Sequence, residues 1–185
     1  LAHLAMQAGI PAGVINVLCG KTEEIGQTLT GSTQVRKLTF TGSTRVGKML
    51  AADCAATMKR TTMELGGNAP FIVFADADLD AAVAGVVASK YRNAGQTCVC
   101  ANRILVEDEI YDTFAERLAS SAQAFKLGDS RDEAVTMGPL IHQGAAEKVV
   151  DLVDDALAKG ALVRQGCGIS DLGSGYVEPG VLIDV

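Results

Sequence analysis

Residues 37–56 read KLTFTGSTRVGKMLAADCAA, in which a strand pattern over 37–41 is followed by a helix pattern over 44–56. The apolar side chains expected on one side of this helix are Val46, Met49 and Leu50. A short turn with glycine and serine joins the two elements. Strands that alternate with helices in this way are typical of a parallel sheet with crossover helices, so we expect an α/β fold.

The same alternation continues on both sides of this unit. We expect further strands at residues 14–18, 63–65, 71–74, 104–106 and 181–185. We expect further helices at residues 1–8, 22–31, 79–87, 110–125 and 149–157, with starts favoured by Thr22, Asp78 and Asp108 and ends by Gly31 and Gly160. The run at 71–74 is continuously apolar, and residues 14–18 are apolar except for Asn16. Such runs are typical of buried strands, and we expect residues 71–74 to be buried on both faces of a parallel sheet.

The pair Gly66-Gly67 is the expected domain boundary, because glycine permits the backbone angles that close off a strand. We therefore expect one domain over residues 1–66 and another over residues 67–185. The chain begins inside a helix pattern without Met and ends inside a strand pattern. We expect it to be part of a longer protein.

The composition is that of a globular protein and excludes the disordered and fibrous classes: of 185 residues, 48% are hydrophobic and 21% are charged. A net charge of −6 supplies no basic patch for phosphate backbones, so we expect neither nucleic acid nor a membrane surface as a partner. No run of about 18 apolar residues is present to span a bilayer. Small neutral or anionic metabolites remain as candidate ligands.

The five cysteines are an odd number and lack the regular spacing of a secreted disulfide scaffold. We expect free thiols in a reducing compartment, the cytoplasm or, in a eukaryote, the mitochondrial matrix. Cys19, Cys54 and Cys167 are interpreted as small buried hydrophobic residues, which is the commonest environment of a free cysteine.

A polar loop over residues 93–103, NAGQTCVCANR, carries the other two cysteines between a helix and a strand. A cysteine in a loop with nearby backbone amides can be held as a thiolate, the attacking form. Free cysteines are otherwise usually buried, and the pattern alone leaves both interpretations open for Cys98 and Cys100. Their spacing is too short for one metal ion and no further ligands stand beside them, so no metal site is expected.

Three other positions have two interpretations each. The turn with Gly42 and Ser43 precedes a helix, where free amides favour an anion, but a plain strand-to-helix turn uses the same residues. Glu64 ends a strand before two glycines and is either a general base in a crevice or a solvated strand end. Arg92 either binds a substrate carboxylate or is a solvated cation at a helix end.

Three short motifs follow one another along the chain: FTGST at 40–44, ELGG at 64–67 and NAGQTC at 93–98. In this order they resemble the motifs of the aldehyde dehydrogenase superfamily. The resemblance runs from AGIPAGVINV at 8–17 to MGPL at 137–140. Within the superfamily, YRNAGQTCVCANR at 91–103 is most similar to succinate-semialdehyde dehydrogenases. The chain is less than half as long as a usual member.

The resemblance implies a fold and a set of site residues. It implies the C-terminal part of a Rossmann-type NAD(P)-binding domain over 1–66 and part of the catalytic domain over 67–185. The residues implied to bind NAD or NADP are Gly42, Ser43, Gly47 and Leu65. The implied catalytic residues are Cys98 as the nucleophile and Glu64 as the general base. Arg92 matches an arginine that pairs with the distal carboxylate of the substrate.

The implied activity is NAD(P)-dependent oxidation of an aldehyde to an acid through a thiohemiacetal and a thioester on Cys98. Succinate semialdehyde is the favoured substrate, and the whole protein is expected to be a homo-oligomer, a dimer or tetramer. Cys100 matches a second thiol, which we expect to form a reversible disulfide with Cys98 under oxidation. The chain alone is expected to be inactive.

Other functions stay open at this point. One is a dehydrogenase for another aliphatic or carboxylated aldehyde, and another is a non-catalytic remnant or interaction protein on the same fold. A thiol hydrolase would need a histidine near Cys98, and neither His3 nor His142 lies at catalytic spacing.

Overall fold

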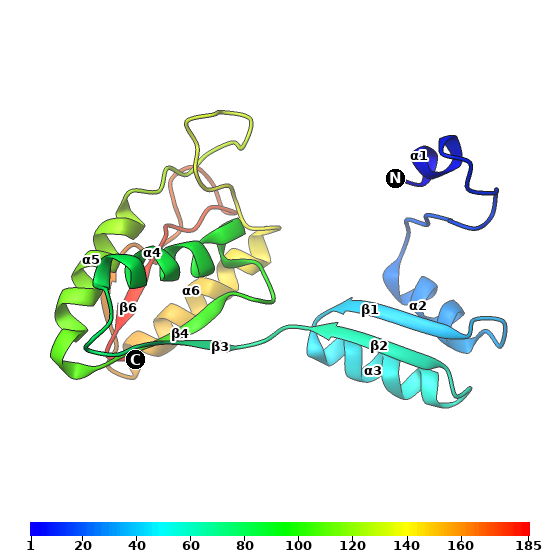
Figure 1. The fold of residues 1–185 in the computed structure, drawn as a ribbon, viewed down its shortest axis with the longest axis horizontal. Coiled ribbons are helices and arrows are strands. Elements are labelled where there is room, and N and C mark those ends of the chain that lie inside the picture. The colour runs from blue at the N-terminus through cyan, green and yellow to red at the C-terminus, as the bar shows by residue number, and fades with distance from the viewer. The chain divides into compact units, whose positions relative to one another are not determined.

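The computed structural model describes residues 1–185, which form two compact units, Leu1–Leu65 and Gly66–Val185. Each unit combines helices with a pair of parallel strands (Figure 1). The predicted α/β class is therefore confirmed. The assignment of the two units to a nucleotide-binding and a catalytic domain stays a prediction. None of the helices is long and apolar enough to cross a membrane.

The first unit is built around one strand-helix-strand crossover. Its elements in order are α1 (Ala2–Gln7), α2 (Thr22–Gly31), β1 (Lys37–Gly42), α3 (Thr44–Ala55) and β2 (Arg60–Leu65). The two strands are parallel, and their register runs from Lys37 opposite Arg60 to Gly42 opposite Leu65. Helix α3 is the crossover that a parallel pair requires, and it lies along the sheet (Figure 1).

The buried side of α3 follows helical spacing, but not quite as expected. Leu50 and Cys54, four residues apart, are buried, and Val46 is half-buried one turn earlier. Met49 is exposed, although it was expected on the buried side. It lies one residue, or about 100° of helical rotation, away from that line.

The expectation of a buried strand at residues 14–18 is wrong. These residues form no strand, and Leu18 is 75% exposed. A strand needs a neighbour for its backbone N–H and C=O groups, and β1 and β2 pair only with each other. Cys19 follows this segment and is exposed, so its interpretation as a buried residue is also wrong. Thr22 does not cap α2 either, because Lys21 occupies that position.

The second unit contains a parallel strand pair, an antiparallel pair and three α-helices. Its elements are β3 (Ala69–Val73), α4 (Leu79–Lys90), the short 3₁₀ turn η1 (Arg92–Gly95), β4 (Ala101–Val106), η2 (Asp108–Ile110), α5 (Tyr111–Gln123), α6 (Gln143–Ala158), β5 (Leu162–Gln165) and β6 (Val181–Ile183). Strands β3 and β4 are parallel, whereas β5 and β6 are antiparallel. The buried core joins β3, α4, α5 and β6 through Val73, Val83, Val86, Phe114, Leu118, Ala122 and Val181.

Strand β3 is buried on one face only. Val73 belongs to the core, whereas Ile72 is 56% exposed and Phe74, just past the strand, is exposed as well. Leu105 of β4 stands opposite Ile72 in the register and is also exposed. Helices α4 and α5 share the core with Val73 on the other face, so the expectation that residues 71–74 are buried on both faces is wrong. Strand β5 was not expected, because LVRQ is short and half polar.

Side-chain and glycine caps set several helix ends in this unit. Asp78 Oδ1 accepts from the amides of Asp80 and Ala81 at 3.0 and 3.1 Å, which confirms the expected start of α4. Asp108 does not cap α5, since it lies in η2 and Ile110 occupies the cap position. Gly160, with a φ of 108°, follows α6 as expected.

Candidate active site

Cys98 lies in the loop that connects η1 to β4, and its side chain is exposed. No hydrogen bond within the chain engages its thiol or its main-chain N–H. Val99 beside it is exposed too. The loop therefore presents a free thiol and a free amide donor at the same residue.

Cys100, two residues further on, has the opposite environment. It is 2% exposed, its Sγ donates to the main-chain oxygen of Lys90 at 3.7 Å, and it lies 2.8 Å from Thr97 Oγ1. These contacts fasten the loop to the C-terminal end of α4. The two interpretations left open by the sequence thus separate: Cys98 is accessible and Cys100 is a buried hydrogen-bonded thiol.

The backbone before Cys98 takes an uncommon path. Asn93, Ala94 and Gly95 have φ angles of 52°, 53° and 75°. Left-handed angles are easy for glycine and tolerated by asparagine, but they are strained for alanine. Such backbone strain persists only where the surroundings fix it and is concentrated at functional sites.

The start of β4, just after the loop, is tied to the second glycine of the ELGG motif and to the residue after it. Asn102 Nδ2 donates to the main-chain oxygen of Gly67 at 3.3 Å, and Arg103 donates to that of Asn68 at 3.1 Å. A Cβ placed on Gly67 would stand 3.4 Å from the main-chain oxygen of Cys98. The structure therefore brings the second glycine of the ELGG motif next to the thiol loop.

Arg92 follows the last turn of α4 and is exposed. It forms no salt bridge within the chain, although five other ion pairs are present. It belongs to the same unit as Cys98 and stands six residues before it. An unpaired guanidinium there can bind a carboxylate by donating two parallel hydrogen bonds to it.

The other predicted site residues gather at the carboxyl end of the β1–β2 pair in the first unit. Glu64 stands opposite Thr41 in the register, is exposed, and is followed by Leu65 opposite Gly42. Gly47 on α3 packs against Leu65, because a Cβ at Gly47 would stand 2.6 Å from Leu65 Cδ2. In open α/β sheets, ligands bind beyond the carboxyl ends of the strands.

Ser43 and Gly42 lie at the start of α3. Ser43 caps the helix, since its Oγ accepts from the amide of Val46 at 3.4 Å, and Gly42 before it is exposed. The amides of the first helical turn have no partner inside the helix and favour an anion. A Cβ on Gly42 would stand 2.4 Å from the Phe40 ring, so a larger residue would displace that ring.

Two residues near the thiol loop were missed by the sequence analysis. Gln96 accepts a hydrogen bond from the main-chain N–H of Ile141 at 2.9 Å, and the Tyr91 hydroxyl donates to Gly180 O at 2.9 Å. Burial, with a smaller contribution from Cys167, raises the pKa of Tyr91 to about 12. Their partners lie 45 and 89 residues away, so no local pattern could reveal these contacts.

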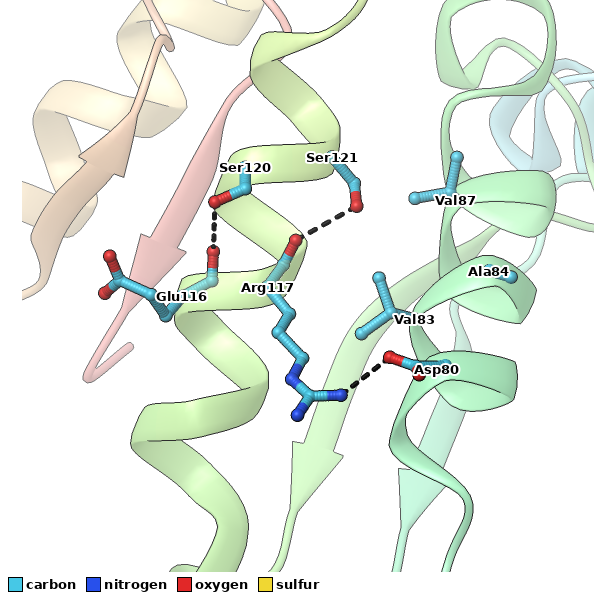
Figure 2. Close-up of a pocket in the computed structure, with 8 residues that line it drawn as sticks. All are labelled: Asp80, Val83, Ala84, Val87, Glu116, Arg117, Ser120 and Ser121. Atoms are coloured by element: carbon cyan, nitrogen blue, oxygen red, sulfur yellow. Dashed lines mark hydrogen bonds and ion pairs between the residues drawn. The ribbon is translucent and has the colours of Figure 1, made fainter.

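An open groove of about 460 Å³ lies elsewhere in the second unit, between α4 and α5 (Figure 2). Val83 and Val87 form its apolar side, and Arg117 crosses it to reach Asp80 at 2.6 Å. None of the predicted site residues lines it. Arg117 is paired with Asp80 and Glu116 with Arg164, and both lining serines donate to main-chain oxygens of α5, so the groove offers no free catalytic group.

Comparison with known proteins places the chain in a family. The model of the "Aldehyde dehydrogenase family" matches residues 1–185, and the chain belongs to this family. It is 55% identical to a 3-sulfolactaldehyde dehydrogenase of Pseudomonas putida and 52% identical to the succinate-semialdehyde dehydrogenase (NADP+) of Escherichia coli strain K12. Both alignments cover 100% of this chain and 38% of the relative.

A solved structure gives the same result for the fold. The crystal structure of succinate-semialdehyde dehydrogenase from Burkholderia pseudomallei matches with a TM-score of 0.97 and 53% sequence identity, over 100% of this chain and 38% of that one. The aldehyde dehydrogenase-like fold expected from the sequence is therefore confirmed. The chain spans about 38% of the length of these relatives.

Proposed function

We propose that this chain is the nucleophile-bearing part of an NAD(P)-dependent aldehyde dehydrogenase that oxidises an aldehyde with a distal carboxylate, succinate semialdehyde first of all. The observation that carries the proposal is the accessible Cys98, with a free thiol and a free amide, in the same unit as the unpaired Arg92. The family membership of residues 1–185 supports it.

Cys98 is the nucleophile in this proposal. Its thiolate attacks the aldehyde carbon, the C=O pair moves to the oxygen, and a thiohemiacetal forms. The main-chain N–H of Cys98 has no partner within the chain and is free to donate to this oxyanion. Arg92 binds the carboxylate at the other end of the substrate and so selects anionic aldehydes.

Release of the acid requires water. Loss of hydride from the thiohemiacetal carbon leaves a thioester on Cys98, and nicotinamide, when bound, supplies the acceptor for that hydride. Glu64 is proposed as the base that takes a proton from the hydrolytic water, whose oxygen then displaces the Cys98 thiolate. The carboxylate of Glu64 is exposed at a strand end, as a residue that must exchange protons requires.

The proposed dinucleotide site consists of residues on the β1–α3 turn and the end of β2. Ser43 and the amides of the first turn of α3 would hold the pyrophosphate, and Gly42 keeps the turn small. Gly47 and Leu65 would support this turn through their close contact. The relative from Escherichia coli is named for NADP+, which supports a nicotinamide dinucleotide and leaves NAD or NADP as the proposal.

Two proposals concern the whole protein. We expect a homo-oligomer, a dimer or tetramer, and we expect it in the cytoplasm or, in a eukaryote, the mitochondrial matrix. The five free cysteines of the structure support a reducing compartment.

The test is steady-state oxidation of succinate semialdehyde by the complete enzyme, followed through formation of NADH or NADPH. Cys98→Ala should lower kcat by at least about 10³-fold, whereas Cys19→Ala, which removes the other exposed thiol, should leave kcat unchanged. Glu64→Gln should slow thioester hydrolysis and leave a burst of reduced cofactor in the first turnover. Full activity of Cys98→Ala would refute the proposal.

The substrate class is tested separately by comparing succinate semialdehyde with butanal, which has the same chain length and no carboxylate. We expect kcat/KM to favour the carboxylated aldehyde by about 10- to 100-fold, as a charged hydrogen-bond pair predicts. The isolated 185-residue chain should form no NADH or NADPH above its Cys98→Ala control.

A further inference from the structure

We infer that Gln96 is a positioning residue whose side chain braces the strained turn before Cys98 against the segment that starts α6. The inference rests on the proposed function, because it assigns a role to Gln96 in placing the proposed nucleophile. The evidence is a set of hydrogen bonds within the second unit.

Both ends of the Gln96 side-chain amide are engaged. Its Oε1 accepts from the main-chain N–H of Ile141 at 2.9 Å, and its Nε2 donates to the main-chain oxygen of Asn93 at 3.1 Å. Asn93 returns a bond, since its Nδ2 donates to the main-chain oxygen of Gln96 at 3.2 Å. Because each end of the amide is already held by the main chain, we assign Gln96 a role through the loop rather than as a catalytic residue.

The other partner of the brace is itself well held. Leu140, beside Ile141, donates its main-chain N–H to Gly175 O at 2.8 Å. On the other side, His142 caps α6, since its Nδ1 accepts from the amide of Ala145 at 3.0 Å. Ile141 therefore presents its N–H from a fixed point between two anchored neighbours.

The turn also has an anchor at its beginning. The Tyr91 hydroxyl donates to Gly180 O, and the Tyr91 ring lies 5.2 Å from that of Phe125. Between Tyr91 and Gln96 the backbone runs through three successive left-handed residues. Strain of this kind needs support on both sides, and Gln96 supplies the support on the side of Cys98.

The side chains of Cys98 and Val99 cannot replace this brace, because both are exposed and neither packs into the core. Downstream, Cys100 is buried under the contacts with Thr97 and Lys90. Loss of the Gln96 brace should therefore loosen the whole segment from Asn93 to Cys100. It should let Cys98 drift from the geometry of attack, and geometry of this precision is what a nucleophile requires.

The variant Gln96→Met keeps the length of the side chain and removes both hydrogen bonds. Gln96→Glu keeps the acceptor for Ile141 and removes the donor to Asn93. Gln123→Met is the matched control, because Gln123 is exposed at the end of α5 and its side chain makes no hydrogen bond. In the complete enzyme, Gln96→Met should lower kcat by about tenfold with little change in KM, and Gln96→Glu should recover part of that loss. Rates are compared over a range of pH, because the added carboxylate also disfavours the Cys98 thiolate.

Two readouts do not depend on dehydrogenase activity. Hydrogen exchange at the Ile141 amide should speed up by about fivefold in Gln96→Met and stay slow in Gln96→Glu and Gln123→Met. Alkylation of Cys100 by iodoacetamide, followed by peptide mass spectrometry, should also rise about fivefold in Gln96→Met. Cys54, buried in the other unit, is the internal reference and should not change.

The outcomes separate the inference from the function on which it rests. Faster exchange at Ile141 with unchanged kcat would overturn the positioning role and leave the dehydrogenase proposal intact. Unchanged exchange and alkylation in Gln96→Met would overturn the brace itself. If the unmodified enzyme oxidises no aldehyde while exchange and alkylation respond as expected, the proposed function fails and the brace stands.

Discussion

Replacing Tyr91 with phenylalanine should destabilise the second unit by about 1 to 2 kcal/mol at neutral pH. The substitution keeps the ring beside Phe125 and removes the hydroxyl that donates to Gly180 O at 2.9 Å. A net hydrogen bond contributes about 1 kcal/mol, and a half-buried carbonyl left without its donor adds to the loss. Tyr176→Phe is the control, because the Tyr176 side chain makes no hydrogen bond and is also half-buried.

The stability difference between the unmodified protein and Tyr91→Phe should depend on pH, and the pKa of Tyr91 sets the direction. Burial raises the pKa of Tyr91 from 10.0 to about 12 in the folded chain. Between these values the folded state holds the phenol proton and the unfolded state has lost it, so stability falls as pH rises. At pH 11 the loss is about 1.4 kcal/mol relative to neutral pH, because one pH unit separates that point from the unfolded pKa.

The assay is urea unfolding of the unmodified protein and of Tyr91→Phe at about pH 8 and pH 11. The m-values of the two proteins are compared, because a difference would indicate a changed denatured state. Only the difference between the two proteins matters, since other phenols, thiols and amines titrate in both. We expect the stability advantage of the unmodified protein at pH 8 to shrink nearly to zero at pH 11. An advantage that is equal at both pH values would refute the reasoning.

Three further predictions concern the sites. Arg92→Met should raise KM for succinate semialdehyde by about 10- to 100-fold and leave KM for butanal unchanged, as steady-state kinetics would show; equal effects on both would argue against carboxylate binding. Gly47→Ala should lower the unfolding free energy in urea by about 1 kcal/mol or less, because the methyl group would push into Leu65 while alanine favours the helix, and a raised midpoint would refute this close contact. Peroxide should join Cys98 and Cys100 and remove two hydrogens from their peptide, with water as the other product. Mass spectrometry that shows no such loss would exclude the disulfide.

The local part of the fold could be predicted because it depends on neighbours in the sequence. The β1–α3–β2 unit follows from a strand pattern and helical spacing, all within about 30 residues. Asp78 marks the start of α4 for the same reason, because a cap bonds to amides two and three residues away.

The wrong predictions concern strand formation and burial that depend on distant parts of the chain. Residues 14–18 are apolar enough for a buried strand, yet hydrophobicity alone does not supply a neighbouring strand. Ile72 belongs to an apolar run, but the packing of helices on one face of the sheet decides its exposure. Both are tertiary effects that override a local pattern.

The candidate site shows the same division. Cys98 could be selected only as one of two loop thiols, and the resemblance of NAGQTC to a family motif decided between them. The burial of Cys100 depends on the main-chain oxygen of Lys90, and the brace of Gln96 depends on Ile141. No sequence pattern around Cys100 or Gln96 indicates these partners.

The outer face of the β3–β4 pair has a practical consequence for work with this chain. Ile72 and Leu105 stand opposite each other there, both exposed, on a sheet of only two strands whose outer edges remain unpaired. Unpaired edges beside apolar side chains favour intermolecular sheet growth. Preparations of the isolated chain will therefore tend to aggregate as concentration rises, and light scattering should accompany every measurement on them. Replacing Ile72 with lysine would put a charge on this face and should improve solubility.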